Sequence, residues 1–309
     1  MLVEPRDAAT VMLVRDAPGS PDRPDRPDLG TVDQSTIDES TIEVFMLRRN
    51  LRSKFVAGAY VFPGGAVDAD DRGAPVTDLI EGLDAAAADA LLGVASGALG
   101  FWVAAIRESF EEAGVLLARD AASGVTVEPG LVAELAPARP AVAAGDRSFA
   151  DLVRQHGLAL DAGALRVFAH WITPEPAPRR YDTWFFVAPA PLGHAYEHDF
   201  DETVASEWVR PADALDRARR GEFELIYPTF RSLQAIAGFA GTSELFDAVD
   251  AAWRGPEPAL RVMNPGKGWQ VRLPGDDGDG GDGDDADADA IAHSTTNRVR
   301  AGAPGRAVH

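Results

Sequence analysis

The sequence predicts an α/β protein, because short β-branched apolar segments alternate with stretches of helical periodicity. Residues 9–15 (A-T-V-M-L-V-R) and 41–48 (T-I-E-V-F-M-L-R) are two such segments, and we expect these strands to pair. Residues 178–187 predict a further strand. Residues 101–113 place apolar side chains at steps of three and four, which predicts a helix with one buried stripe.

The composition is that of a globular protein that can bury a core. The chain has 309 residues, 46% of them apolar, which suffices for one large domain or for one domain with helical additions. We expect neither a membrane span nor a secretory leader. The absence of cysteine excludes disulfides and a Cys-based zinc site, and it favours a cytoplasmic location. The net charge of −20 argues against binding to nucleic acid or to an anionic membrane.

The chain predicts one domain followed by a tail. We expect the domain to span residues 1–274, with a flexible, proline-rich excursion at 18–40. Residues 275–309 are rich in Gly, Asp and Ala and predict a disordered acidic tail. Eight aspartates between positions 276 and 289 supply much of the negative charge, so the domain itself is less acidic than the total indicates.

Three acids stand together in the predicted helix. Glu108, Glu111 and Glu112 are spaced i, i+3 and i+4, so their carboxylates project from one helix face. Such a run alone is typical of a solvated helix face. Like charges this close would raise one another's pKa unless a divalent ion neutralised them, and a hard, oxygen-lined site of this kind suits Mg²⁺ or Mn²⁺.

These residues resemble the signature of the Nudix hydrolase family. Its far end, Arg-Glu-apolar-x-Glu-Glu-x-Gly-apolar, matches residues 107–115, although Ser109 stands in the apolar position. Its near end matches Gly64 and Gly65. Gly65 precedes Arg107 by 42 positions, whereas the family's offset is 14, so we expect a 28-residue insertion inside the motif.

The insertion obscures one family position. The family's intermediate Glu, which helps to pair Arg107, falls on Asp71 when counted forward from Gly65 and on Leu99 when counted back from Arg107. The structural partner of Arg107 could therefore be Asp68, Asp70 or Asp71.

The resemblance implies a Nudix α/β/α sandwich with a mixed sheet, a helical insertion at residues 66–100 and extra C-terminal helices. An alanine-rich run predicts one helix over residues 77–93, capped by Thr77 or Asp78. We expect this helix to pack near the substrate entrance. The layout is similar to the insertion-bearing, peroxisomal coenzyme A diphosphatase-like subgroup.

Capping residues and helix-breaking residues predict further helices. The expected helices cover residues 130–141, 148–157, 211–220, 229–239 and 242–253, and a hairpin is expected at 261–273. We expect the C-terminal helices to pack on the sheet or on a second subunit.

The resemblance also implies site roles. Glu108, Glu111, Glu112 and the Gly65 carbonyl would hold the metal, and Glu112 or Glu202 would accept the proton, with Glu108 also catalytic. Glu197 and Glu207 are rivals of Glu202 for the acid that completes the site. The histidines receive no metal role; they are His170, His194 and His198.

A partial upstream signature points to coenzyme A. Its positions match Arg49, Lys54, Gly58 and Phe62, with Lys replacing the second Arg. Arg and Lys there would hold outer phosphates, and surface charge at a strand end is the alternative.

A second set of candidates lies near the strand at 178–187. Arg179 or Arg180 would face another phosphate. Trp171 or Tyr181 could stack on a base, although tryptophans such as Trp171 and Trp184 are more often core residues.

The expected reaction is metal-dependent hydrolysis of a diphosphate bridge. Coenzyme A or acyl-coenzyme A is the first substrate, and ADP-ribose, dinucleotides or nucleoside triphosphates are the second. A nucleotide-sensing Nudix domain without catalysis is a third reading, against which the three helix glutamates argue. Nudix enzymes often dimerise, so a homodimer is one expected assembly.

Overall fold

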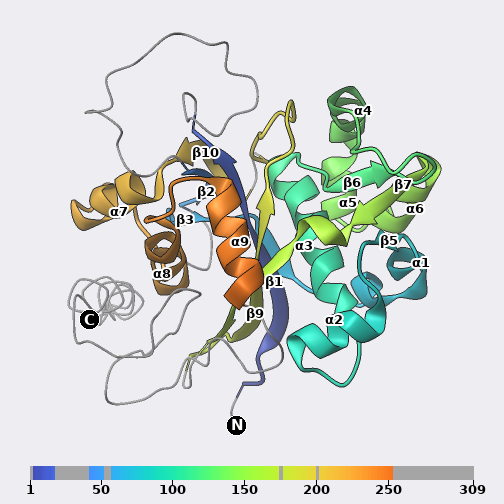
Figure 1. The fold of residues 1–309 in the computed structure, drawn as a ribbon, viewed down its shortest axis with the longest axis horizontal. Helices are drawn as coiled ribbons and strands as arrows, with labels where there is room; N and C mark the ends of the chain where they lie inside the picture. The colour runs from blue at the N-terminus through green and yellow to red at the C-terminus, as the bar shows by residue number, and fades with distance from the viewer. Residues whose placement is uncertain (1–2, 18–41, 52–56, 174–176, 200–201, 253–309) are drawn as a thin grey trace, which may run out of the picture.

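The computed structural model describes residues 3–17, 42–51, 57–173, 177–199 and 202–252 (Figure 1). The predicted excursion at 18–40, Lys54, the hairpin at 261–273 and the tail at 275–309 lie outside these residues. The strands are β1 (Arg6–Asp16), β2 (Ile42–Arg49), β3 (Tyr60–Val61), β4 (Gly64–Ala66), β5 (Ile80–Glu81), β6 (Ala118–Asp120), β7 (Leu158–Asp161), β8 (Arg166–Ile172), β9 (Tyr181–Pro189) and β10 (Thr203–Val209).

The α-helices are α1 (Ala74–Thr77), α2 (Ala85–Leu92), α3 (Leu99–Ala113), α4 (Pro129–Leu135), α5 (Arg139–Ala143), α6 (Phe149–Gln155), α7 (Pro211–Arg219), α8 (Tyr227–Ile236) and α9 (Thr242–Ala252). Three 3₁₀ turns accompany them in the described ranges: η2 (Asp70–Arg72), η3 (Ala136–Ala138) and η4 (Ala162–Ala164).

The larger sheet is mixed and has the strand order β10-β2-β1-β9-β8. The predicted pairing of the first two strands is confirmed, since Val14 of β1 lies opposite Val44 of β2. β1 runs parallel to β9 along one edge. Along its other edge, the first half of β1 pairs with β4 and the end of β1 pairs with β2. The register sets Thr10 opposite Gly64, so the sheet itself positions the glycine loop.

Alternate residues of β1 enter two separate cores. Val11 and Leu13 pack with α3 on one face of the sheet, whereas Met12 and Val14 pack with α8 and α9 on the other. Because both sheet faces are covered by helices, β1 is apolar throughout its centre. Figure 1 shows α3 on one side of the sheet and α7, α8 and α9 on the other, which is the predicted α/β/α sandwich.

Helix α3 forms as predicted and is buried on nearly all sides. Its apolar stripe includes Trp102, Ile106 and Phe110, each at most 1% exposed. Burying one such side chain contributes about 2 kcal/mol. Gly114 ends the helix at φ +66°, a left-handed conformation in which its N–H reaches back to the Phe110 carbonyl.

The insertion differs from the single predicted helix over 77–93. α1 ends at Thr77, β5 follows, and α2 begins only at Ala85. Gly82 takes φ +83°, which breaks the helix, and the Asp84 carboxylate accepts the Ala87 N–H at 2.8 Å and starts a new one. Alanine content favoured one helix, but the left-handed glycine and the Asp84 cap divide the segment.

The insertion also packs in a different place from the one predicted. β5 joins β7 in parallel and extends a second sheet of order β5-β7-β6, while α2 packs against α3. No residue of α1, β5 or α2 lines the main cavity of the described chain. The expected packing beside the substrate site is therefore not found for these elements, and residues of η3 and α5 line the cavity instead.

Two prolines shape the segment after α3. The helix predicted over 130–141 divides into α4, η3 and α5, because Pro137 and Pro140 have no N–H to continue one helix. α6 forms as predicted, with the Ser148 hydroxyl accepting the Asp151 N–H at 3.2 Å.

The C-terminal helices cover the sheet. Pro211 begins α7 as predicted, and α8 begins at Tyr227, slightly before the expected start. α9 packs against β1 and β8, so the sheet is its partner. None of the described helices combines the length and hydropathy that a membrane crossing requires.

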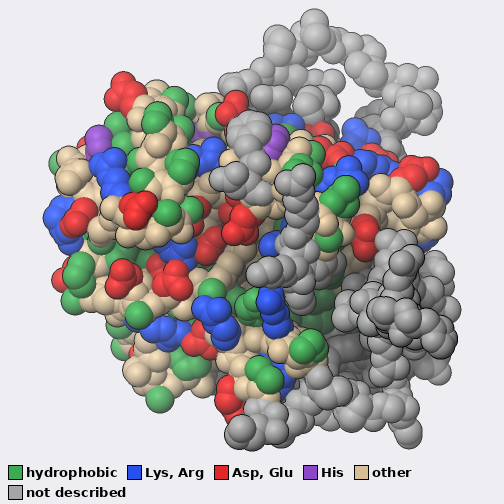
Figure 2. Space-filling view, turned by 180° about the vertical axis from the view of Figure 1, so that it is seen from behind, with side chains coloured by type: hydrophobic (Ala, Val, Ile, Leu, Met, Phe, Trp, Pro, Cys, Tyr) green, Lys and Arg blue, Asp and Glu red, His purple; other side chains and the backbone are tan. Residues whose placement is uncertain are grey.

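On the face shown in Figure 2, acidic and basic side chains are interspersed over the described surface. Where the described residues are visible on that face, their basic side chains do not form one continuous stripe.

Candidate active site

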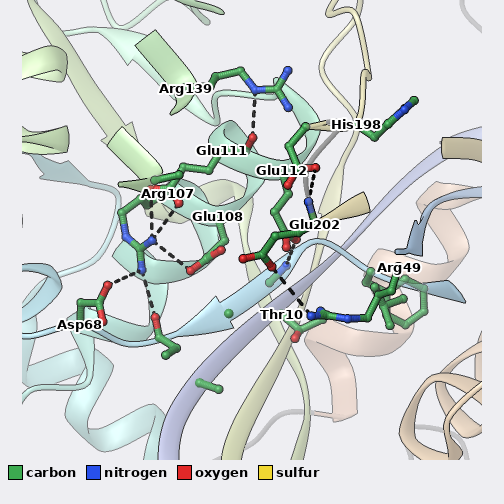
Figure 3. Close-up of a pocket in the computed structure, with 18 of the residues that line it drawn as sticks. Thr10, Arg49, Asp68, Arg107, Glu108, Glu111, Glu112, Arg139, His198 and Glu202 are labelled. Carbon is green, nitrogen blue, oxygen red and sulfur yellow. Dashed lines mark hydrogen bonds and ion pairs between the residues drawn. The ribbon is translucent and has the colours of Figure 1, made fainter. Parts of the chain in front are cut away.

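A cavity of about 930 Å³ lies beside the C-terminal half of α3. Segments far apart in the sequence form its walls: β1, the Gly64–Gly65 loop, α3, η3 with α5, the start of β9, residues 197–199 with Glu202, and α8. All three predicted metal ligands of the helix line this cavity; they are Glu108, Glu111 and Glu112 (Figure 3).

The glycine loop contacts the helix acids directly. The Gly64 N–H donates to Glu112 Oε2 at 2.9 Å, across 48 positions of sequence. A Cβ on Gly65 would lie 2.4 Å from Glu108 Oε1, so only glycine lets the loop come this close. The structure therefore brings the two ends of the interrupted motif together.

Arg107 is buried behind these acids. Its Nε and Nη2 donate to the two carboxylate oxygens of Asp71, both at 2.9 Å, and Asp68 lies farther away at 3.6 Å. Asp71 is thus the principal partner among the three predicted candidates. Arg107 Nη1 also donates to Glu108 at 3.0 Å and to Glu111 at 3.1 Å.

Burial raises the pKa of the helix acids. It raises the pKa of Glu108 to about 7, against the lowering effect of Arg107. Burial also raises the pKa of Glu112 well above its usual value, and the nearby Glu108 charge adds to the rise. The pKa of Glu111 is raised for the same first reason. These carboxylates would be stabilised in the ionised form by a nearby cation.

The donor set suits a hard divalent cation. Buried carboxylate oxygens with raised pKa values are the chemistry that Mg²⁺ and Mn²⁺ neutralise. Among the described residues, no three acidic or histidine side chains already surround one metal position. Arg107 draws Glu108 and Glu111 toward itself, and the Gly64 amide holds Glu112. These side chains would have to rotate before they could share one metal ion.

The predicted phosphate-binding residues separate into two groups. Arg49 and Arg179 line the cavity. Arg180 does not; its Nε donates to the Thr173 carbonyl at 2.9 Å and its Nη1 to the Val3 carbonyl at 2.8 Å. Arg180 therefore ties the start of β9 to the N-terminal segment, which does not fit a substrate role.

Glu202 and Glu197 line the cavity, and Glu207 does not. Glu202 Oε2 lies 3.8 Å from an Arg49 nitrogen at the cavity side (Figure 3). Glu207 pairs with Arg217 at 2.7 Å, outside this cavity. Glu207 is therefore a poor candidate for the completing acid.

The aromatic and histidine candidates also separate. Tyr181 lines the cavity, whereas Trp171 is 4% exposed and belongs to the core. His198 reaches the cavity wall, while His170 pairs with Asp182 and stacks on Trp184.

Arg139 is a cavity residue that the sequence did not identify. It donates to two backbone carbonyls, those of Glu111 and Glu197. A backbone carbonyl has no sequence signature, and the A-P-A-R-P run at 136–140 suggested only a helix. The proline–alanine neighbours of Arg139 offered no other signal.

Comparisons with known proteins agree with this geometry. The family model of the NUDT19 Nudix domain matches residues 93–236. The chain is 30% identical to the acyl-coenzyme A diphosphatase NUDT19 of Gallus gallus, over 88% of this chain and 79% of that protein. It is also 30% identical to the protein of that name from Homo sapiens, over 76% of this chain and 71% of that protein.

A solved structure is similar as well. The crystal structure of a NUDIX hydrolase from Alicyclobacillus acidocaldarius superposes with a TM-score of 0.57 at 26% identity, over 79% of this chain and 96% of that chain. The extent of the sequence match and this structural likeness lead to one assignment. The chain belongs to the Nudix hydrolase family and, within it, to the NUDT19 subgroup.

Proposed function

We propose that this Nudix hydrolase cleaves the diphosphate bridge of coenzyme A or of an acyl-coenzyme A. The observation that carries the proposal is one cavity that combines the acids of α3, the arginines Arg49 and Arg179, and an apolar wall. Two relatives are named acyl-coenzyme A diphosphatase, which supports the same substrate class. Water would attack one phosphorus of the bridge and release two phosphomonoesters.

Members of the family depend on divalent metal ions, and we propose Mg²⁺ or Mn²⁺ here. Glu108, Glu111 and Glu112 would hold it, helped by the Gly65 carbonyl. When bound by these residues, a divalent ion would supply positive charge for the phosphate oxygens and would lower the pKa of the attacking water. Asp71 supports the arrangement because it keeps Arg107 behind the acids rather than among the ligands.

A carboxylate must accept the proton of the attacking water. Glu112 is one candidate, since the Gly64 N–H fixes one of its two oxygens. Glu202 is the other, because it lines the same cavity. Glu108 would take part through charge, and its raised pKa makes its ionisation sensitive to a bound cation.

Arginines would hold the outer phosphates of the substrate. Arg49 and Arg179 approach the cavity from different segments, β2 and the turn before β9. A guanidinium can bind a phosphate with two parallel hydrogen bonds. Lys54 stays a prediction.

The apolar part of the substrate needs apolar side chains to pack against. η3, α5 and the following residue provide them: Ala136, Pro137, Pro140, Ala143 and Ala144. All five side chains line the same cavity. Small side chains there leave room for a pantetheine arm and an acyl chain, whereas a nucleoside triphosphate has no group of this kind.

The test is hydrolysis of a substrate panel with Mg²⁺ or Mn²⁺, followed by product masses. Coenzyme A, acyl-coenzyme A, ADP-ribose, NADH and dNTPs form the panel. Release of 3′,5′-ADP from coenzyme A is expected, at a higher kcat/KM than for the other nucleotides. A preference for ADP-ribose would reject coenzyme A as the substrate. No turnover of any compound would favour a nucleotide-sensing domain without catalysis. The cytoplasmic location and the homodimer stay predictions.

A further inference from the structure

Arg139 lies at the joint between three segments of the cavity. It begins α5, is half-buried, and points toward the C-terminal turn of α3 (Figure 3). Its Nε donates to the Glu111 carbonyl at 3.0 Å, and its Nη2 donates to the Glu197 carbonyl at 2.9 Å. One planar guanidinium therefore binds the end of α3 and the loop that leads to Glu202.

The carbonyls at the end of α3 require partners. The last four C=O groups of an α-helix have none within the helix. The Gly114 N–H donates to the Phe110 carbonyl, and the Val115 N–H donates to the Ser109 carbonyl. The Glu111 carbonyl is served by Arg139, whose positive charge also suits the helix C-terminus.

The backbone of Glu197 is hydrogen-bonded both to α3 and to Arg139. The Glu197 N–H donates to the Ala113 carbonyl at 3.1 Å, while the Glu197 carbonyl accepts from Arg139. Both sides of the Glu197 backbone are thus bound, one directly to α3 and the other through Arg139. The loop cannot shift relative to the helix without breaking at least one of these bonds.

Asp199 connects the fixed Glu197 backbone to Glu202. Asp199 Oδ1 accepts the Glu202 N–H at 3.0 Å and the Thr203 N–H at 2.9 Å. Asp199 stands two positions after Glu197, so little chain separates the fixed backbone from this turn. The contacts form a route from Arg139 through Glu197 and Asp199 to Glu202.

From these contacts we infer that Arg139 is a positioning residue of the active site, which sets the place of Glu202 relative to the acids of α3. The inference rests on the proposed diphosphatase function. Two guanidinium nitrogens are already used on carbonyls, which distinguishes Arg139 from a residue held only for substrate. Because a misplacement of about 1 Å can lower a rate about 10²-fold, the effect should appear in kcat.

The test compares R139M and R139K with R147M. Arg147 lies nearby, but its guanidinium bonds to Gln155 and it does not line the cavity. R139M should lower kcat about 10- to 100-fold with KM changed less than about threefold. R139K keeps the charge but not the two-pronged geometry, so it should recover part of the rate. R147M should match wild type.

A second readout needs neither substrate nor metal. Hydrogen exchange of the metal-free protein should show faster exchange in a peptide covering residues 192–203 in R139M, and no change in R147M. Unchanged exchange in folded R139M would overturn the positioning role even if no substrate were turned over. This result is separate from the substrate panel, so loss of the coenzyme A assignment and loss of the Arg139 role can be told apart.

A double-mutant cycle tests the route to Glu202. If Arg139 acts through Glu202, R139M should lower kcat less than about threefold in an E202Q background. An equal loss in both backgrounds would overturn the route. A raised KM with unchanged kcat would overturn the inference as well, since it would make Arg139 a substrate-binding group.

Discussion

Arg107 and Asp71 form a buried, two-pronged ion pair behind the candidate metal site, with Asp71 only 3% exposed. Asp71 stands six positions after Gly65, the offset at which the Nudix signature carries its intermediate Glu. The aspartate therefore pairs with Arg107 from this position, with a side chain one methylene shorter than that of Glu. The extra residues lie between Asp71 and α3, and the near end of the motif is continuous.

D71N tests this pairing. It leaves the Arg107 guanidinium buried with a weaker partner, and breaking one side of a buried pair costs about 3–5 kcal/mol. Because Glu108 and Glu111 still contact Arg107, we expect a loss near the lower end of this range, seen as a lower urea midpoint. D70N is the matched control, because Asp70 is the exposed neighbour. Equal midpoints for D71N and D70N would contradict the pairing.

Features that depend on the pattern within one segment could be predicted from the sequence. Contacts with backbone groups far away in the sequence could not. α3, its buried stripe, its glutamates and its terminal glycine follow from periodicity within one segment. The sequence could not show whether Asp71 or Leu99 occupies the position of the intermediate Glu. The insertion can lie on either side of that position, so counting from Gly65 and counting from Arg107 are equally valid. Arg139 was missed because its partners are carbonyls 28 and 58 positions away. Such contacts exist only after folding.

The helical insertion shows a related limit. Alanine propensity summed over residues 77–93 favours one helix, but propensity is a weak prior against a backbone break. Gly82 and the Asp84 cap decide the local structure, and pairing of Ile80 with Leu160 in the second sheet requires an extended segment there. The tertiary partner, 80 positions later in the sequence, could not be read from the run itself.

G65A tests the close approach of the glycine loop. The added Cβ would meet the end of the Glu108 side chain at 2.4 Å, so that flexible side chain must move while the fold is retained. We expect kcat to fall at least about tenfold, by analogy with other misplaced catalytic groups, and the melting temperature to change little. G130A is the control, because a Cβ there meets nothing within 4 Å. Full activity in G65A would show that Glu108 is not needed where it lies.

E112Q tests the role of the helix acids. The amide oxygen of Gln can still accept the Gly64 N–H, so the loop should remain docked and the protein should fold. Loss of the negative charge removes either a metal ligand or the proton acceptor, and we expect kcat to fall about 10²- to 10⁴-fold. Steady-state rates with Mg²⁺ and Mn²⁺, with circular dichroism melts as a folding check, provide the measurement. Wild-type rates would reject the assignment.

Arg179 and Arg180 provide an internal comparison of adjacent residues. Arg179 lines the cavity, so R179A should raise KM for coenzyme A about tenfold through loss of a charge-assisted phosphate contact. Arg180 binds backbone carbonyls, so R180A should lower stability and leave KM near wild type. Initial-rate kinetics and thermal melts on both variants distinguish the roles. The reverse pattern would exchange the two assignments.

The pH dependence of metal stabilisation follows from the raised pKa of Glu108. Its pKa is about 7 in the folded protein and 4.5 in the unfolded reference, so the folded state binds the proton more tightly. This group's contribution to stability is present below about pH 4.5 and is lost as the pH rises through about 7. The raised pKa values of Glu111 and Glu112 act in the same direction.

A bound divalent cation removes this loss, because it holds the carboxylates in the ionised form without a proton. Addition of Mn²⁺ should therefore raise the melting temperature more at pH 8 than at pH 5.5. E108Q has no proton to lose at this position, so its metal-free melting temperature should fall less between these pH values than that of wild type. If wild type and E108Q gave the same pH dependence and the same response to Mn²⁺, the ion would not be held beside Glu108.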